Sequence, residues 1–456
     1  EEECSEMALV LFVSLARHNN NHVWLAGAVA AYVSLLRMDL PIRQAATLQL
    51  CTGLADTIEA RHLLICGDMI PALSNFSTHA DEMIRRAAVG LLYNLLATPL
   101  VMDTDVNYVN AMKLIVPWLT ESELLLLVTM EDMYLSYFAL NIYGALVHGT
   151  LLVGSLSQER LKAVPSLKVS SSAFFESEEE GGEAEGGEDK EGEQKPKVAI
   201  APAVSVSDAS TQLAALVLRM AGEEKLHQVI RTSIVQGKNV AVAQVAAHTA
   251  VGMAMYAPAD MFDHNAMEIF AELLQFKEIR PRQSAAALLL FLLQGGERSS
   301  EILRVLIEDP EMLRTFVALP EDVTATDEAV SYVLELLGRE GDDGLQALKA
   351  LPLGTILVQM GRYGSLAAQH HVAALLLQLT DMSAWRSLFL ESEVLIMLAE
   401  LCNKNEKTDA CVVARKAVFG FVEGGIMIFP CKSPLPSCIR WWRKRTYQLS
   451  PCSCPC

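Results

Sequence analysis

The chain has 456 residues and a formal net charge of -19 at pH 7, with a pI near 5.0. Sequence-independent nucleic-acid binding needs clustered Lys and Arg, so this acidic balance argues against nucleic acid and anionic membrane as partners. Hydrophobic residues make up 52% of the chain and aromatic residues only 6%. That balance is typical of packed Ala- and Leu-rich helices rather than of β-sheets.

Residues 1–160 are predicted to form a first block of helical repeats. Two apolar segments, Met7–Ala16 and Val23–Arg37, have the composition of helices and are separated by the sequence RHNNNH. His18 and His22 stand four residues apart, a spacing that could share a metal only on a helix. The three asparagines between them favour a solvated turn instead.

A twelve-residue pattern of small residues followed by leucines recurs in this block. It reads RQAATLQLCTGL at Arg43–Leu54 and RRAAVGLLYNLL at Arg85–Leu96, a shift of 42 residues. The uncharged run Met133–Leu156 stands where a further copy is due. Because it contains polar residues and lacks basic flanks, we interpret it as a buried helix with its turn rather than a membrane span.

Residues 161–208 interrupt the pattern. The stretch Glu176–Lys197 holds ten acidic and three basic residues with repeated Gly-Gly pairs. Such a segment buries too little apolar surface to offset its ordering entropy, so the sequence predicts a disordered acidic linker. The alternative interpretation is that this segment attracts a basic partner electrostatically.

Residues 209–428 are predicted to form a second, more regular block. The pattern reads RQSAAALLLFLL at Arg282–Leu293 and QHHVAALLLQLT at Gln369–Thr380, with weaker copies at Val242–Met253 and Asp327–Leu337. The two strong copies are separated by two steps of about 43 residues each. A period of about 40 to 47 residues is the signature of armadillo and HEAT repeats. We therefore expect an all-α, armadillo/HEAT-like right-handed α-solenoid.

Residues 429–456 differ from both blocks. This basic tail carries Trp441 and Trp442 and five of the ten cysteines. The spacing of its last cysteines lacks the paired ligands of a zinc site, so we expect a disordered tail and no metal. Four other cysteines stand in apolar helical contexts and are expected to be reduced core residues: Cys51, Cys66, Cys402 and Cys411.

No motif of an enzyme is present in the sequence. There is no Gly-rich phosphate loop, no H-E-x-x-H and no G-x-S-x-G, and the histidines at 370 and 371 fall inside a predicted core helix. The sequence therefore predicts neither catalysis nor a cofactor.

A solenoid offers instead a surface formed by the last helix of each repeat. In armadillo proteins that clamp extended peptides, an asparagine recurs there, and Asn94 in YNLL resembles it. The register of the copies gives the candidate protein-binding groove Thr52, Asn94, Met253, Phe291, Leu334 and Gln378, with Ala145 at the same place in the Met133 run. With one Asn among seven, an apolar and adaptable groove fits better than a backbone clamp.

The segment Val372–Ile426 resembles the C-terminal armadillo repeats of the UCS-domain family of myosin chaperones. The resembling phrases are LFLESEVLIMLAEL and ARKAVFGFVEGGIM. The resemblance implies a cytoplasmic protein that holds the myosin motor domain while it folds. It also implies docking to Hsp90 through an N-terminal tetratricopeptide domain, which would have to precede this chain.

Three functions follow from these observations. The first is a myosin-directed chaperone or co-chaperone, and the second is a general armadillo scaffold that binds a helix or peptide in cytoskeletal or signalling assemblies. The third is a regulatory subunit of an enzyme whose catalytic domain lies outside this fragment. The chain opens without Met, so we expect it to be a fragment or a processed product.

Overall fold

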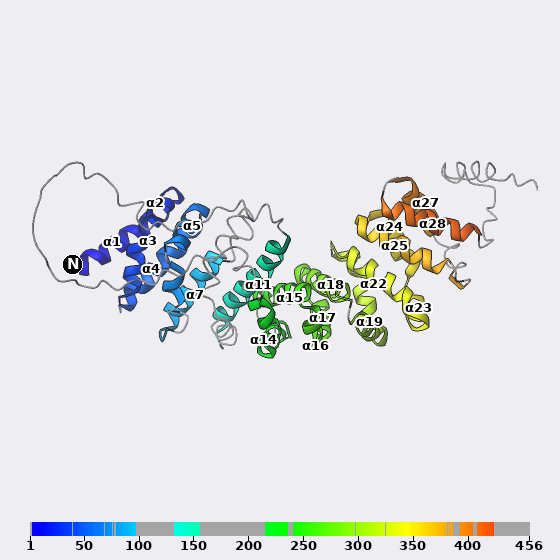
Figure 1. Ribbon diagram of the computed structural model, residues 1–456, viewed down its shortest axis with the longest axis horizontal. Helices are drawn as coiled ribbons and strands as arrows, with labels where there is room; N and C mark the ends of the chain where they lie inside the picture. The colour runs from blue at the N-terminus through cyan, green and yellow to red at the C-terminus, as the bar shows by residue number, and fades with distance from the viewer. Residues whose placement is uncertain are drawn as a thin grey trace, which may run out of the picture. The chain divides into compact units, whose positions relative to one another are not determined.

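A computed structural model places most of the chain in α-helices (Figure 1). It describes residues 2–38, 40–67, 69–74, 76, 79–96, 132–155, 215–235, 240–296, 298–323, 325–380, 382, 384–385, 393–404 and 408–423. No β-strand occurs among these residues, in agreement with the all-α prediction. The predicted acidic linker and the predicted basic tail lie outside the described residues.

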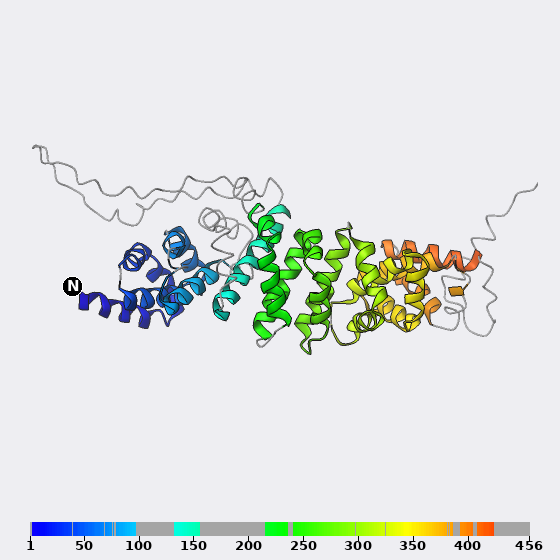
Figure 2. The same cartoon turned by 90° about the horizontal axis from the view of Figure 1, so that it is seen from below.

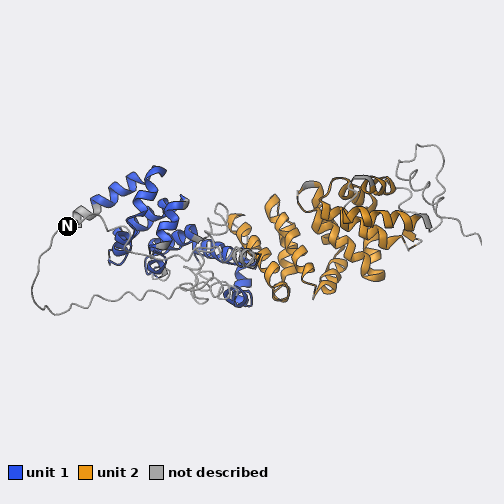
Figure 3. Cartoon of the chain, turned by 45° about the horizontal axis from the view of Figure 1, so that its top comes forward, with its two compact units in different colours: residues 1–233 blue, residues 234–456 orange. Residues whose placement is uncertain are grey.

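The chain divides into two compact units, residues 1–233 and 234–456 (Figure 3). The division differs from the domain limits expected from the sequence, because residues 215–233 belong to unit 1. The Tyr143 hydroxyl donates a hydrogen bond of 3.1 Å to the Val217 carbonyl, so both sides of the 161–208 segment are anchored in that unit.

Unit 1 is built from short helices that alternate with longer ones. Its helices are α1 (Glu2–Leu15), α2 (His22–Ala26), α3 (Val29–Leu36), α4 (Pro41–Leu54), α5 (Ile58–Cys66), α6 (Met69–Ser74), α7 (Glu82–Leu96), α11 (Met133–Ser155) and α14 (Glu224–Val235), which ends two residues past the boundary. Residues 215–221 are also helical. The predicted segment Val23–Arg37 is therefore two helices, divided at Gly27 and Ala28.

Unit 2 repeats the same design with more regularity. Its helices are α15 (Val240–Tyr256), α16 (Pro258–Asp263), α17 (Ala266–Leu274), α18 (Ile279–Gln294), α19 (Ser299–Glu308), α20 (Pro310–Val317), α21 (Leu319–Asp322), α22 (Asp327–Arg339), α23 (Gly341–Lys349), α24 (Leu353–Tyr363), α25 (Leu366–Leu379), α27 (Val394–Lys404) and α28 (Asp409–Glu423). Several of these helices begin at residues that favour a helix start. Proline occupies the first position of α16 and α20, and Ser365 caps the start of α25.

The helices form groups of three in which the third is the longest of its group. In unit 1 these are α2–α3–α4 and α5–α6–α7, and in unit 2 they are α16–α17–α18 and α23–α24–α25, with α19 to α22 between them. The long third helices contact one another in order, α4 to α7 to α11 in unit 1 and α15 to α18 to α22 to α25 to α28 in unit 2. The predicted copies of the recurring pattern lie in α4, α7, α15, α18, α22 and α25, all of which belong to these two series.

Cross-contacts show that neighbouring third helices run parallel. Between α7 and α11, Arg86 pairs with Asp132 at the helix starts, and Tyr93 contacts Phe138 one to two turns further along both. Parallel layers of this kind bury the apolar residues of each third helix against two neighbours.

The apolar run at 133–156 is a helix, as predicted, but no turn occurs in it as far as Ser155. Residues 142–147 of α11 are all buried. Among the described residues, no helix is both long and apolar enough to cross a bilayer.

Two smaller expectations from the sequence have mixed outcomes. Cys51, Cys402 and Cys411 are free thiols in the core, as predicted, whereas the side chain of Cys66 lies outside the described set. The prediction of a solvated turn at RHNNNH is wrong for His22. This residue is buried, and its Nε2 lies 2.7 Å from the Ala16 carbonyl oxygen. His18 is exposed, as expected.

Candidate protein-binding face

We call the outward side of α15, α18, α22 and α25 the third-helix face of unit 2. In the view of Figure 1, α15, α18 and α22 lie along one side of the unit, with α16, α17 and α19 along the other. On α18 the residues that escape burial include Ser284, Ala287 and Phe291. Their spacing of three and four residues places them on a single side of the helix.

The third-helix face carries few charges. Neither α15 nor α25 contains Asp, Glu, Lys or Arg, and the charges of α18 are confined to Arg280 and Arg282 near its start. The exception is α22, which carries Asp327 and Glu328 at its start and Glu335 and Arg339 further along. Three other helices of unit 2 carry more charge: Glu301, Arg304 and Glu308 on α19, Glu311 and Arg314 on α20, Asp342, Asp343 and Lys349 on α23. Solvent-facing helix surfaces normally carry charge, and charge depletion is characteristic of the centre of protein interfaces.

Apolar side chains take the place of charges on this face. Phe291 and Leu290 are half-buried on α18, as are Leu336 on α22 and Leu377 on α25. Side chains in this state keep part of their apolar surface in water, and that surface is available to a partner.

A polar cluster joins α22 to α25 at the middle of the face. The Glu335 carboxylate is only 5% exposed; its Oε2 lies 2.6 Å from Nδ1 of His371, and its Oε1 pairs with Arg339. A carboxylate at neutral pH only accepts hydrogen bonds, so Nδ1 of His371 carries the proton and donates it. The Tyr332 ring lies against the imidazole, with centroids 5.0 Å apart. These contacts hold the imidazole ring of the half-buried His371 in one orientation.

Close approach of the same two helices depends on a glycine. A Cβ added to Gly338 would lie 2.6 Å from Cδ1 of Leu375 and 2.7 Å from Oε1 of Gln378. Gln378 therefore packs over the backbone of α22, where its Oε1 is buried and has no hydrogen-bond partner among the described residues.

The six residues predicted from the sequence fall into different environments. Phe291 and Gln378 are half-buried on the third-helix face, and Thr52 and Asn94 are half-buried on the third helices of unit 1. The Thr52 hydroxyl donates to the Leu48 carbonyl of its own helix at 2.8 Å. The role of these four in binding stays a prediction.

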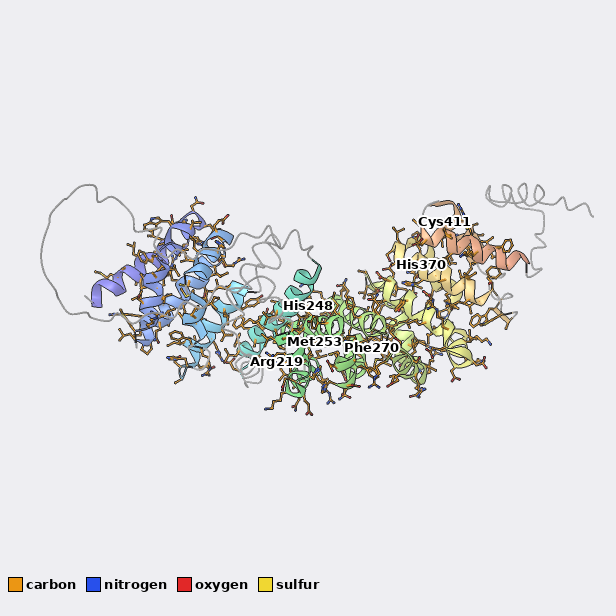
Figure 4. The ribbon with its side chains drawn as sticks, in the orientation of Figure 1. Arg219, His248, Met253, Phe270, His370 and Cys411 are labelled. Carbon is orange, nitrogen blue, oxygen red and sulfur yellow. The ribbon has the colours of Figure 1, made fainter. Side chains whose placement is uncertain are left out.

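Met253 and Leu334 do not lie on a surface. They are 1% and 0% exposed, because α15 and α22 turn these positions toward the neighbouring layers. Figure 4 shows Met253 on α15 and His248 on the same helix, and His248 is exposed. Ala145 of α11, at the same register, is 4% exposed.

Sequence reasoning missed the exposed His248, the half-buried His371 and the buried Glu335 that pairs with His371. The repeat step from α18 to α22 is longer than the uniform period, since these helices end at Gln294 and Arg339. The ends are 45 residues apart, two more than the period of about 43, so the register advances by two residues at α22 and gives the half-buried Leu336 instead of Leu334.

Comparison with solved structures supports the helical architecture. A crystal structure of an engineered protein superposes with a TM-score of 0.60 at 15% sequence identity, covering 92% of this chain and 96% of the other. Two further engineered proteins have TM-scores of 0.42 and 0.41 at 16% and 18% identity, each covering 71% of this chain and 98% of the other. At such identities the first of these likenesses bears on the fold alone. No protein-family model and no curated protein matches the chain.

Proposed function

We propose that the chain is an armadillo-type protein without catalytic activity, and that unit 2 binds a segment of a protein client on its third-helix face. The armadillo assignment is supported by groups of three helices that recur along the chain, since armadillo and HEAT repeats of this length have three or two helices. The observation that carries the binding proposal is the near absence of charged residues on α15, α18 and α25, in contrast to α19, α20 and α23.

The physical reason is the cost of leaving such a face in water. Half-buried Leu and Phe side chains that face solvent leave apolar surface in water and do not stabilise the helix there. A partner that covers them stabilises the complex by about 25 cal/mol for each Å² of apolar surface removed from water. The flexible and apolar character of these side chains suits a hydrophobic or partly folded segment, in the manner of a helix lying in a groove.

We propose the myosin motor domain as the client. This part of the proposal rests on the sequence resemblance of Val372–Ile426 to the UCS-domain myosin chaperones. The resembling segment includes the end of α25 together with α27 and α28, which form the last described layers of unit 2. Docking to Hsp90 stays a prediction of the same resemblance.

The test is a light-scattering assay of a myosin motor domain heated with and without the full chain. The proposal predicts that an equimolar amount of the chain suppresses aggregation and that Phe291→Glu weakens the suppression. Unchanged aggregation would exclude the myosin-chaperone function. A stable complex with a folded adaptor, without any effect on aggregation, would favour the scaffold function instead.

A further inference from the structure

Residues that escape burial form two adjoining rows on the neighbouring helices α22 and α25 (Figure 2). On α22 the row is Tyr332, Leu336 and Arg339, and on α25 it is His371, Ala374 and Gln378. Steps of three and four residues place each row on one side of its helix. The rows touch, because the ring centroids of Tyr332 and His371 are 5.0 Å apart. His371 therefore lies on the third-helix face together with Leu336 and Gln378.

One nitrogen of the His371 imidazole is occupied within the protein. Its Nδ1 lies 2.6 Å from Oε2 of Glu335, and Oε1 of the same carboxylate pairs with Arg339. Arg339 balances the charge of Glu335, so a neutral imidazole leaves the cluster without net charge. Because the carboxylate accepts the Nδ1 proton, Nε2 of the neutral ring has a lone pair and accepts hydrogen bonds.

The other nitrogen, Nε2, is open to a partner. Among the described residues it makes no hydrogen bond, and it is not one of the buried atoms that lack a partner there. The side chain of His371 is 19% exposed. By contrast, Nδ1 of the adjacent His370, which is labelled in Figure 4, is buried without a partner among these residues. The third-helix face thus has an oriented acceptor at the position of His371.

The neighbours of His371 on the two rows favour a partner with a large apolar side chain. Leu336 and Ala374 are apolar, and the Tyr332 ring lies against the imidazole. A single acceptor beside apolar surface fits a side chain that has a large apolar body and one hydrogen-bond donor. Tryptophan and tyrosine have this character and are enriched among the residues that contribute most to protein interfaces.

We propose that Nε2 of His371 accepts a hydrogen bond from the indole N–H of a tryptophan or the hydroxyl of a tyrosine in the client segment. The aromatic ring of the client would cover Leu336 and Ala374, and His371 would determine specificity on the third-helix face. Apolar surface alone discriminates weakly between tryptophan and an aromatic ring without a donor. An acceptor that the ligand leaves unpaired discriminates more strongly, because its contact with water is lost without replacement. This role rests on the proposed function of the third-helix face.

The experiment compares two fluorescein-labelled amphipathic helical peptides of about 18 residues that differ only in the central residue of their apolar side. One has tryptophan there, and the other has 3-benzothienylalanine, in which sulfur replaces the indole N–H and the shape of the ring is kept. Fluorescence anisotropy gives the Kd of each peptide for the full chain, for His371→Phe and for His18→Phe, a matched control at an exposed histidine of unit 1. Far-UV circular dichroism reports whether each variant keeps its helices.

We expect the wild-type chain and the control to bind the tryptophan peptide about three- to tenfold more tightly than the benzothienylalanine peptide, which is the effect of one hydrogen bond. His371→Phe should bring this ratio to about one. Glu335→Gln should also lower the ratio, since an amide beside Nδ1 no longer determines which ring nitrogen carries the proton. Equal Kd values for the wild-type chain, or a ratio that His371→Phe leaves unchanged, would overturn the proposal. So would a protonated Nε2 in the nitrogen-15 NMR spectrum of the wild-type imidazole at pH 7.

A further variant, Phe291→Glu, distinguishes the role of His371 from that of the whole face. If both peptides bind with the same Kd and Phe291→Glu weakens both, the role of His371 is wrong and the third-helix face remains the binding surface. If Phe291→Glu weakens neither peptide, the face itself is not the binding surface and the role of His371 fails with it. Absence of binding by both peptides would overturn the role of His371 alone, because suppression of motor-domain aggregation tests the client function separately.

Discussion

Glu335 and His371 connect two successive third helices of unit 2, with Oε2 of the carboxylate 2.6 Å from Nδ1 of the imidazole. The carboxylate is nearly fully buried, and Arg339 occupies its second oxygen. An acidic side chain in this position is stable only while both partners remain, because a buried polar group without partners costs free energy.

Removing this carboxylate should destabilise the α22–α25 contact. We expect Glu335→Ala to lower the free energy of unfolding by about 1 to 3 kcal/mol, since it leaves His371 without its acceptor. Glu328→Ala, on the same helix but half-exposed, is the control and should cost less than about 0.5 kcal/mol. Urea denaturation followed by circular dichroism measures both, and equal losses in the two variants would contradict the role given to the cluster.

Two glycines of unit 1 should respond in opposite directions to alanine. A Cβ at Gly67 would lie 2.8 Å from Cγ2 and 2.9 Å from Cβ of Val29, whose β-branched side chain has little freedom to move. Gly53 has open space around it inside α4. Gly67→Ala should destabilise by about 1 to 3 kcal/mol through overpacking, and Gly53→Ala should stabilise by about 0.5 to 1 kcal/mol. Thermal melts that give both changes the same sign would be inconsistent with this packing.

The ion pair between Arg86 and Asp132 should make unit 1 sensitive to acid. Burial alone would raise the pKa of Asp132, but the Arg86 guanidinium and the backbone N–H groups of Tyr134 and Leu135 hold that pKa below its usual value. An acid with a depressed pKa in the folded state stabilises the fold above its unfolded pKa of about 3.9, and this contribution is lost as pH falls through the folded pKa.

Asp132→Asn should therefore lower the melting temperature at pH 7. The difference from the wild-type chain should shrink as pH falls below about 4, where the carboxylate of the unfolded chain is protonated. Melting temperatures measured across this range decide the matter. A difference that stays constant with pH would mean that the carboxylate charge does not contribute.

Much of the architecture could be predicted from the pattern of small residues and leucines. The copies at Arg43, Arg85, Arg282 and Gln369 all lie in long third helices, because an Ala-rich segment lets neighbouring layers approach closely. The shorter helices α16, α20 and α24 were not predicted. They begin at or near Pro258, Pro310 and Pro352, and a short amphipathic segment beside a proline gives a weak periodic signal.

The candidate face was only partly predictable. A constant period correctly places Phe291 and Gln378 at half-buried positions. The step from α18 to α22 is longer than this period, so the same period applied to α22 selects Leu334, which is a core residue. The contact of Glu335 with His371 depends on how two parallel helices are rotated against each other, and one sequence does not determine that rotation.

A charge placed on the third-helix face should weaken client binding without unfolding the chain. We expect Phe291→Glu to reduce affinity for the client by at least about tenfold, because an interface core excludes unpaired charge. The matched control is Ile307→Glu, at an apolar and equally half-buried position on α19, away from the face. Surface plasmon resonance with immobilised myosin motor domain measures both, and equal effects would argue that the substitution acts through stability.

The most direct measurement is site-specific photo-crosslinking of the full chain in cell extract. A benzophenone amino acid is placed at Phe291 on α18 in one sample and at Arg304 on α19 in another, and the crosslinked products are identified by mass spectrometry. We expect one protein to be captured from position 291 and not from position 304. Capture of the same protein from position 304, with none from 291, would contradict the assignment of the third-helix face as the binding surface.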